Sequence, residues 1–288
     1  MQTHDISLSM ADKVKLAGKL YLPDGPGPYP AVVMSHGFSA LMDMGLDPFA
    51  KAFQKAGLAA LIYDHRNFGH SDGDIRQEVD PWQQIRDMRE VISHARIHEA
   101  LDSTRIALWG TSYSGGHVLV IGAVDRRISC IVSQVPVTSG SGAIERMITA
   151  PEMSSFLNTI YKDYDDRARG HPATTIPVYQ SEGETAKWAE ALGEGTGYLN
   201  EITLRSRDLW LEYEPWSFMH RISPTPLLMI VAANDTRVPT RDQLEAYDRA
   251  LEPKELLLLD CKHYDPYMSR LDEASKAACE FFVKHLKP

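Results

Sequence analysis

The feature that most constrains the fold is a series of short apolar runs, each followed by a stretch with helical spacing. Apolar strands without polar alternation are buried on both faces, which indicates an α/β fold with a mostly parallel, doubly covered sheet. The expected strands of the sheet are Ala31–Ser35, Leu58–Tyr63, Arg105–Trp109, Ile128–Val135, Pro226–Ala233 and Glu255–Leu259. The expected helices are Asp47–Ala56, Pro81–Ile97, His117–Val124, Arg241–Leu251 and Glu273–His285. Two alternating segments, His4–Met10 and Lys15–Leu22, predict an antiparallel hairpin at the sheet edge.

The regular alternation stops between residues 140 and 223. This stretch holds several tyrosines, three of the five tryptophans and a helical pattern at Glu184–Leu192. Disordered segments are poor in aromatic residues, so we expect a packed helical cap at residues 140–223. The cap would be inserted into a core made of residues 1–139 and 224–288, for which the chain is long enough.

A serine lies at a tight turn between an apolar strand and a helix, in the sequence Gly110-Thr111-Ser112-Tyr113-Ser114-Gly115. A sharp turn of this kind exposes the hydroxyl, and the next helix directs free N–H groups at the site. The sequence differs from G-x-S-x-G because Ser114 stands at the second glycine position. A phosphate loop is the alternative, but neither G-x-G-x-x-G nor Gly-Lys-Ser/Thr is present. We therefore predict Ser112 as a nucleophile.

This motif resembles the nucleophile elbow of α/β-hydrolases. Its Ser-Tyr-x-Gly form is similar to the X-Pro dipeptidyl-peptidase and cocaine-esterase branch, and to dienelactone-hydrolase-like proteins. Enzymes that release or transfer polyketide acyl chains share this style of sequence. The resemblance covers about residues 15–138 and 224–288 and implies the α/β-hydrolase fold with a Ser-His-Asp triad.

Two residues match the remaining triad positions in the expected chain order. Asp235 follows the strand Pro226–Ala233, at an edge where such folds bind ligands, and His263 follows the last expected strand. A turn aspartate and a surface histidine are the ordinary alternatives. Order and position favour Asp235 as the acid and His263 as the base, over the neighbouring Asn234 and Asp260.

The resemblance also implies an oxyanion hole. The turn His36-Gly37-Phe38 ends the first core strand, and the backbone N–H groups of Phe38 and Tyr113 are the expected donors. His36 itself is expected to be structural, hydrogen-bonded beneath the loop.

The segment 64–73 resembles the family's D-x-R-G-x-G-x-S-x-G loop, in which Asp64 and Arg66 brace the loops near the active site. Asn67 replaces the commoner glycine and tolerates a left-handed turn. The alternative is a metal site made of Asp64, His65, His70 and Asp72, although nothing in the sequence indicates that they converge.

Composition excludes several classes of function. The formal net charge is −9 and no basic cluster is present, which disfavours nucleic acid and anionic membranes as partners. No N-terminal signal pattern and no apolar run near ~20 residues are present, so we expect neither export nor a membrane span. Cys130, Cys261 and Cys279 lack metal-ligand spacing and cannot all pair with one another. Cys130 and Cys261 are expected to be buried free thiols, which fits a reducing cytoplasm.

Together these features predict a hydrolase that cleaves an ester or thioester of a small, hydrophobic acyl substrate without metal or cofactor. The alternatives are an acyltransferase of the polyketide type and a non-catalytic binding protein on the same scaffold. X-Pro peptidase activity is disfavoured, because members with that activity tend to carry an added β-domain and little sequence follows His263. Met42, Met44, Tyr161 and Trp210 are candidates to line the pocket. The oligomeric state is left open, with a homodimer as one option.

Overall fold

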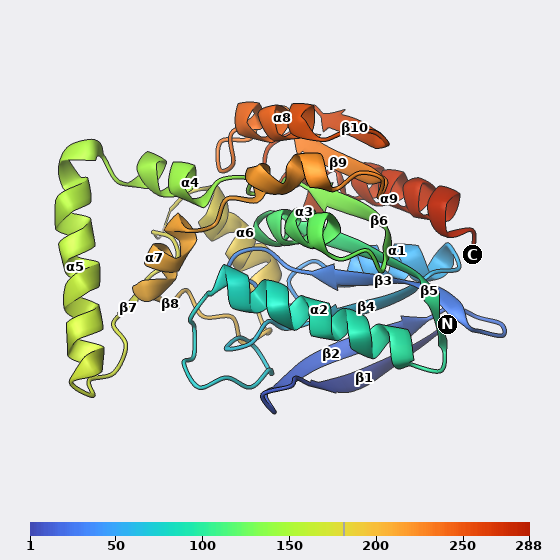
Figure 1. Ribbon diagram of the computed structural model, residues 1–288, viewed down its shortest axis with the longest axis horizontal. Coiled ribbons are helices and arrows are strands. Elements are labelled where there is room, and N and C mark those ends of the chain that lie inside the picture. The colour runs from blue at the N-terminus through green and yellow to red at the C-terminus, as the bar shows by residue number, and fades with distance from the viewer. Residues whose placement is uncertain (181) are drawn as a thin grey trace.

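The structure is a computed structural model that describes residues 1–180 and 182–288. In this part of the chain one eight-stranded sheet has the order β1-β2-β4-β3-β5-β6-β9-β10 (Figure 1). β1 pairs antiparallel with β2, and β2 with β4, whereas the other neighbours are parallel. The strands are β1 (Gln2–Ser9), β2 (Lys15–Leu22), β3 (Tyr29–Ser35), β4 (Ala59–Tyr63), β5 (Leu101–Thr111), β6 (Ile128–Gln134), β9 (Leu227–Ala232) and β10 (Lys254–Leu259).

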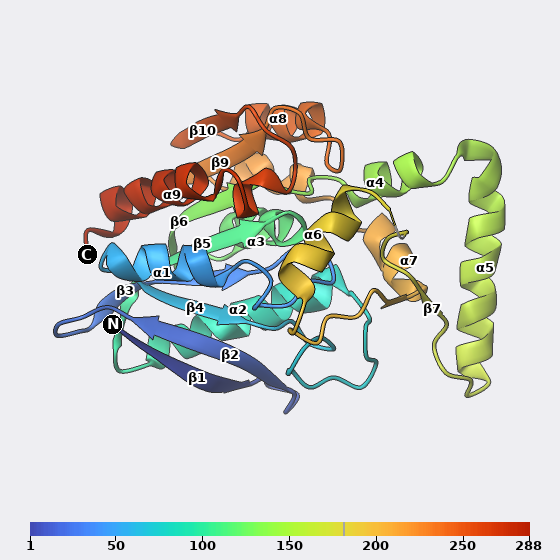
Figure 2. The same cartoon turned by 180° about the vertical axis from the view of Figure 1, so that it is seen from behind.

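Helices cover both faces of this sheet. One face carries α2 and α3 (Figure 1), and the other carries α1 and α9 (Figure 2). The bounds are α1 (Asp47–Lys55), α2 (Pro81–Ile97), α3 (Tyr113–Val124), α8 (Thr240–Arg249) and α9 (Leu271–Leu286). α2 begins as predicted, because the side chain of Asp80 caps it by accepting from Gln83 N at 2.9 Å and Pro81 occupies the first turn. The doubly covered, mostly parallel sheet is therefore confirmed.

Two details differ from the sequence-based expectation. β10 is the last strand of the sheet, so its apolar residues are not all buried: Leu256 is 38% exposed and Leu258 is 50% exposed. α3 begins at Tyr113 instead of His117, so Gly115 lies within its first turn. Glycines lower helix propensity, and here close packing outweighs that preference.

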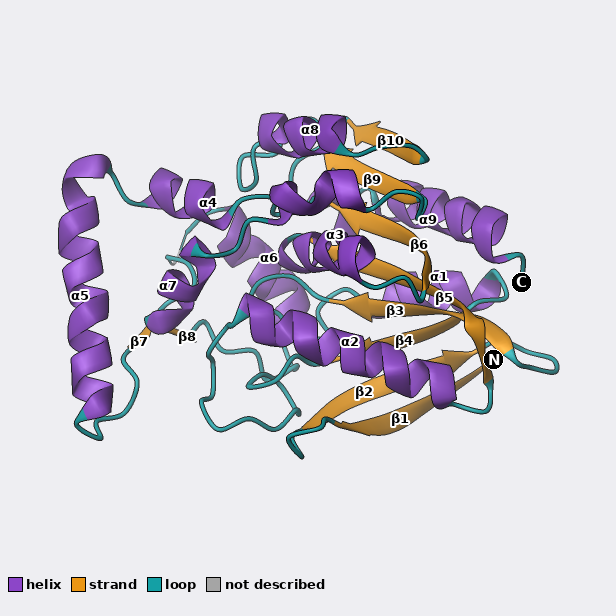
Figure 3. Ribbon diagram, in the orientation of Figure 1, coloured by secondary structure: helices purple, strands orange, loops and turns teal. Residues whose placement is uncertain are grey.

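The segment between β6 and β9 is mainly helical, and most of it lies beyond one end of the sheet (Figure 3). We refer to residues 140–223 as the inserted segment; its division from the core as a separate cap stays a prediction. Its elements are α4 (Gly140–Met147), α5 (Ala150–Ala168), β7 (Thr175–Ile176), α6 (Glu184–Gly193), β8 (Ile202–Thr203), α7 (Arg205–Leu211) and the 3-10 helix η1 (Pro215–Arg221).

The loop that follows β4 is held by Asp64. Its Oδ1 accepts from the backbone N–H of Met42 at 2.8 Å, and its Oδ2 accepts from that of His70 at 3.0 Å. Asn67 has φ 73°, in the left-handed region expected of this position. In the described residues, no group of three or more His, Cys, Asp or Glu side chains is placed to hold a metal ion. Asp64 thus connects this loop to the loop that follows β3.

Arg66 extends the same bracing to α2. Its Nε and Nη2 donate to the two carboxylate oxygens of Asp87 at 2.8 and 2.7 Å, and Nη1 donates to Asp12 at 2.5 Å. Asp87 is fully buried, whereas the Arg66 side chain is 14% exposed. Burial raises the pKa of Asp87, and Arg66 opposes that change. This bidentate pair is strong because two parallel N–H···O hydrogen bonds join the charged guanidinium to the charged carboxylate.

None of the helices in the described chain combines the length and the apolarity that crossing a membrane requires. The three cysteines are free thiols, with Cys130 and Cys261 buried and Cys279 partly exposed. No disulfide therefore contributes to the stability of the described residues.

The Arg66–Asp87 pair generates the first prediction. Arg66→Met leaves a buried carboxylate without its cation, so the free energy of unfolding should fall by about 3–5 kcal/mol in urea titrations. The double variant Arg66→Met/Asp87→Leu removes both charges and should recover much of that loss. An Arg66→Met protein as stable as the parent would contradict this account.

Candidate active site

Ser112 occupies a strained turn between β5 and α3. Its backbone has φ 54° and ψ −114°, a conformation that residues other than glycine rarely adopt. Two neighbouring glycines leave room for the turn. A Cβ on Gly110 would lie 2.2 Å from the carbonyl oxygen of Ser114, and one on Gly115 would lie 2.9 Å from Pro136 Cα. Larger residues at either position would displace the turn that presents Ser112.

The structure brings Ser112, His263 and Asp235 together from distant parts of the sequence. Ser112 Oγ is 3.0 Å from His263 Nε2, and His263 Nδ1 is 2.7 Å from Asp235 Oδ2. Asp235 follows β9 and His263 follows β10, so two neighbouring parallel strands bring both side chains to the same sheet edge. The His263 side chain is 3% exposed and that of Asp235 is fully buried. In this geometry the imidazole is within reach of the hydroxyl proton.

The Asp235 carboxylate is fixed by further hydrogen bonds. Its Oδ1 accepts from the backbone N–H groups of Arg237 and Val238, both at 2.8 Å. Its Oδ2 also accepts from the side-chain amide of Gln243 at 3.0 Å. Gln243 is fully buried on α8. Sequence reasoning missed Gln243, because a lone glutamine on a helix carries no signal without the three-dimensional contact.

The two neighbours considered as alternative acids contact each other. Asn234 Nδ2 donates to Asp260 Oδ1 at 2.8 Å, and both residues are exposed. Neither forms a hydrogen bond with His263 in the described part of the chain. Asp235 is thus the carboxylate that the fold places beside the imidazole.

The backbones of Phe38 and Tyr113 flank the serine. The turn before Phe38 passes close to it, since a Cβ on Gly37 would lie 3.3 Å from Ser112 Cβ. Tyr113 is the first residue of α3, where N–H groups have no partner within the helix. Among residues 1–180 and 182–288, neither N–H has a protein acceptor. Two free N–H groups beside a serine are what an oxyanion hole requires.

Ser114, the departure from G-x-S-x-G, has its own hydrogen bonds. Its hydroxyl donates to the carbonyl oxygen of His36 and lies 3.1 Å from His65 Nε2. The backbone N–H of His65 in turn donates to His36 Nε2 at 3.3 Å. Ser114 thereby connects the serine turn to the loop that carries Phe38, which a glycine could not do. His36 lies buried beneath this loop.

Three buried imidazoles lie next to one another below the turn. The ring centroids of His36 and His65 are 4.5 Å apart, and those of His65 and His117 are 5.8 Å apart. Burial lowers the pKa of His65 well below its ordinary value, and it lowers the pKa of His117 to about 3. Burial also lowers the pKa of His36, although Asp64 opposes the change. The three rings are therefore neutral near pH 7.

A cavity of about 220 Å³ adjoins Ser112 and His263. Its wall is largely apolar and aromatic, and it is formed by both the sheet edge and the inserted segment. Phe38 stacks on Trp210 with ring centroids 4.6 Å apart, so the two parts meet at this wall. An aromatic wall with a few polar groups is typical of a site for a small molecule.

Two of the four candidate lining residues are correct. Met44 and Trp210 line the cavity. Met42 is instead buried among core residues of the sheet, and Tyr161 is 56% exposed on α5. Tyr161 could not be placed from the sequence, because helical spacing does not show which side of an inserted helix faces the site.

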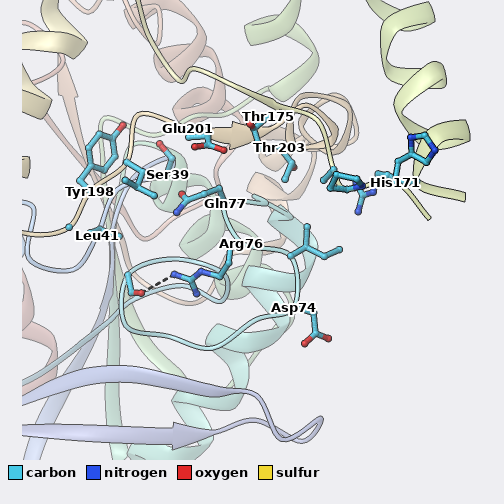
Figure 4. A pocket seen from close by; sticks show the side chains of 17 residues that line it. Ser39, Leu41, Asp74, Arg76, Gln77, His171, Thr175, Tyr198, Glu201 and Thr203 are labelled. Carbon is cyan, nitrogen blue, oxygen red and sulfur yellow. Dashed lines mark hydrogen bonds between the residues drawn. The ribbon is translucent and has the colours of Figure 1, made fainter. Parts of the chain in front are cut away.

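A second hollow, of about 690 Å³, lies on the other side of Tyr198, which borders both cavities. It is formed by the loop before α2 and by residues near β7 and β8 (Figure 4). Arg76 in this wall donates to backbone carbonyls of its own loop. Neither Ser112 nor His263 reaches this hollow, so it is separate from the candidate site.

The whole architecture is shared with a known enzyme. A crystal structure of the α/β hydrolase GrgF from Penicillium sp. sh18 superposes with a TM-score of 0.89 and 26% identity, covering 100% of both chains. The chain is an enzyme of the α/β-hydrolase type. It belongs to the X-Pro dipeptidyl-peptidase (S15) family, whose sequence profile matches residues 12–265.

Relatives within this group carry different names. An uncharacterized 31.7 kDa protein of Escherichia coli, from the traX-finO intergenic region, is 32% identical over 92% of this chain and 94% of its own. The polyketide transferase grgF of Penicillium sp. is 27% identical over 98% of this chain and 96% of its own. The thiohydrolase aneE of Aspergillus aculeatus is 29% identical, with 88% and 83% covered. The relatives thus include a transferase and a hydrolase.

The buried imidazoles generate the second prediction. Between pH 6.5 and 4 an unfolded histidine binds a proton that folded His117 does not, so stability falls as the pH falls, by about 1.4 kcal/mol per pH unit. His117→Gln should reduce the slope of unfolding free energy against pH by about that amount. Tyr213→Phe, which removes the 2.7 Å hydrogen bond to His117 Nδ1 but keeps the imidazole, should leave the slope unchanged. Equal slopes in His117→Gln and parent would contradict the prediction.

Proposed function

We propose that the chain cleaves an ester or thioester of a hydrophobic acyl substrate, with Ser112 as nucleophile, His263 as general base and Asp235 as the acid that orients it. One observation carries the proposal: an unbroken hydrogen-bonded line runs from Ser112 Oγ through both ring nitrogens of His263 to a buried carboxylate. A serine hydroxyl is a weak nucleophile and needs a base in this position.

In the first step, His263 Nε2 takes the hydroxyl proton while Ser112 Oγ attacks the carbonyl carbon. The imidazolium is stabilised by Asp235, to which Nδ1 donates at 2.7 Å. The hydrogen bonds from Arg237, Val238 and Gln243 hold this carboxylate in place. His263 then gives its proton to the departing alcohol or thiol, which leaves an acyl group on Ser112.

The tetrahedral intermediate carries a negative oxygen that needs hydrogen-bond donors. The backbone N–H groups of Phe38 and Tyr113 are the proposed donors, since both lie beside Ser112 and neither has a protein acceptor in the described residues. The dipole of α3 contributes positive potential at the same point. In the second step, His263 deprotonates a water molecule that attacks the acyl carbon, and Ser112 regains its proton.

The hydrophobic character of the proposed acyl group rests on the cavity wall. Trp188, Trp210 and Phe38 supply aromatic surface next to Ser112. Apolar atoms of an acyl chain that leave water for such a wall contribute roughly 25 cal/mol per Å² to binding. A substrate with a short or aromatic hydrophobic chain suits this cavity.

Acyl transfer is the second candidate. It uses the same acyl-serine and differs only in the acceptor, which is an alcohol, amine or thiol in place of water. The likeness to the polyketide transferase grgF, over 98% of the chain, favours this alternative. A non-catalytic binding protein is disfavoured by the intact line from Ser112 to Asp235.

The third prediction tests the nucleophile and its base. Ser112→Ala, His263→Gln and Asp235→Asn should each lower kcat/KM for p-nitrophenyl hexanoate by on the order of 10³ or more. Ser141→Ala, a matched serine on α4, should retain the parent rate. Full activity in Ser112→Ala would rule out the proposed mechanism, whatever the other variants show.

The fourth prediction separates hydrolysis from transfer. The parent enzyme, incubated with p-nitrophenyl hexanoate and millimolar 1-butanol or benzylamine, should release mainly hexanoic acid, because water is in large excess over the acceptor. Mass spectrometry of the products measures the partition. Predominance of the butyl ester or the amide would replace the hydrolase assignment with a transferase.

A further inference from the structure

The wall of the cavity beside Ser112 has a charge opposite to that of the chain as a whole. The protein carries 39 acidic and 30 basic residues, for a net charge of −9. Three arginines, Arg146, Arg207 and Arg237, nevertheless line the cavity, and no Asp or Glu is among its lining residues in the described chain. A low-dielectric cleft lined by charges of one sign concentrates its potential on a ligand of the opposite sign.

Arg207 has no anionic partner in the part of the chain that the structure describes. Its guanidinium donates to the carbonyl oxygen of Val178 at 3.3 Å and lies 3.6 Å from Met147 Sδ. Both acceptors are uncharged, so neither neutralises the cation. Arg207 lines the same cavity as Ser112.

Two neighbouring arginines differ from Arg207 because each forms an ion pair with a carboxylate. Arg146, in the wall of the same cavity, forms an ion pair with Asp242 at 2.8 Å. Arg205, two residues before Arg207 on α7, pairs with Glu78 at 3.0 Å. Both of these arginines have a carboxylate partner, whereas Arg207 has none in the described residues.

Aromatic rings hold the Arg207 guanidinium in the wall. Its carbon lies 5.4 Å from the ring centroids of both Phe38 and Trp210. Burial, followed by the charge of Arg237, lowers the pKa of Arg207 to about 10, so the group remains a cation at neutral pH. A partly buried cation without a counter-ion is unfavourable, and an anion in the cavity would relieve that penalty.

We propose that Arg207 binds an anionic oxygen group, a carboxylate or a phosphate, that the substrate carries in addition to its reacting carbonyl. The inference rests on the proposed function, since it places this group in the cavity of Ser112. The anion lies either on the acyl chain or on the leaving group. The hydrophobic part of the substrate then spans the aromatic wall between the guanidinium and the serine.

Phe38 couples this anion site to the reaction. Its ring contacts the Arg207 guanidinium, and its backbone N–H is the proposed oxyanion donor. An anion held at Arg207 therefore fixes the distance of the substrate carbonyl from Ser112. Arg237, exposed at the cavity wall, adds positive potential along the entry path. Arg207 is in this view a positioning residue that selects the substrate.

Two matched substrate pairs test the proposal. Mono-p-nitrophenyl adipate and p-nitrophenyl hexanoate differ in an anion on the acyl side. Hexanoyl-coenzyme A and the hexanoyl thioester of N-acetylcysteamine differ in phosphates on the leaving group. The measured quantity is the ratio of kcat/KM for the anionic member to that for the neutral member. The parent should favour the anionic member of one pair, and Arg207→Met should lower that ratio about tenfold or more.

Arg207→Lys should retain part of the preference, because it keeps the charge but not the planar fork. Arg221→Gln is the matched control: this exposed guanidinium also lies over an aromatic ring, that of Phe218, but outside the cavity. It should leave both ratios unchanged. An equal loss on the neutral and anionic members in Arg207→Met, or unchanged ratios for both pairs, would overturn the proposal.

Calorimetry separates this inference from the proposed function. Adipate and coenzyme A are titrated into Ser112→Ala and into Ser112→Ala/Arg207→Met, neither of which needs to turn over. One of these anions should bind at least about tenfold more weakly to the double variant. If the parent hydrolyses none of the four substrates but this difference appears, the proposed function fails and the anion site stands. Equal binding by both variants would refute the anion site.

Discussion

At Ser112 the chain turns from β5 into α3 with a backbone conformation that costs roughly 1–3 kcal/mol. The surrounding sheet holds it there. Ser112 N donates to the carbonyl of Gln134 at 2.8 Å, and the carbonyl of Ser112 accepts from Val137 N at 2.8 Å. β5 is itself paired on both sides, by β3 and β6. The strained conformation persists because the strands on either side of β5 hold it in place. This conformation presents the Ser112 hydroxyl to the cavity.

The positions of the other groups follow from the parallel sheet. β3, β5, β9 and β10 are parallel, so the loops that follow them all start at the same side of the sheet, where the carboxyl ends of the strands lie. These loops supply Phe38, Ser112, Asp235 and His263 respectively. For this reason the fold and the three converging side chains could be predicted from the sequence. The strands were predicted from unbroken apolar runs, whereas the roles of Ser112, Asp235 and His263 came from the resemblance to α/β-hydrolases and from their order in the chain. The exposure of apolar residues on β10 could not be predicted, because the local sequence pattern does not show that β10 is the outermost strand of the sheet.

Features that depend on contacts between distant segments could not be predicted from the sequence. Gln243 reaches Asp235 from the next helix, and Ser114 exchanges hydrogen bonds with residues of two other loops. In the described residues Arg207 lacks an anionic partner, and this too is a property of the assembled cavity, since Arg205 on the same helix has one. The net charge of −9 also gave no indication of a cationic cavity. An overall acidic composition and a cationic cavity coexist here because the acidic side chains lie elsewhere in the described structure.

The mechanism requires that His263 deprotonates Ser112 and that the backbone N–H groups of Phe38 and Tyr113 stabilise the oxyanion. A crystal structure of the protein after reaction with a hexyl fluorophosphonate tests it most directly. We expect a covalent bond from Ser112 Oγ to phosphorus, with the phosphonyl oxygen within hydrogen-bond distance of the backbone nitrogens of Phe38 and Tyr113. A protein that stays unmodified, or phosphorus attached to any other residue, would contradict it.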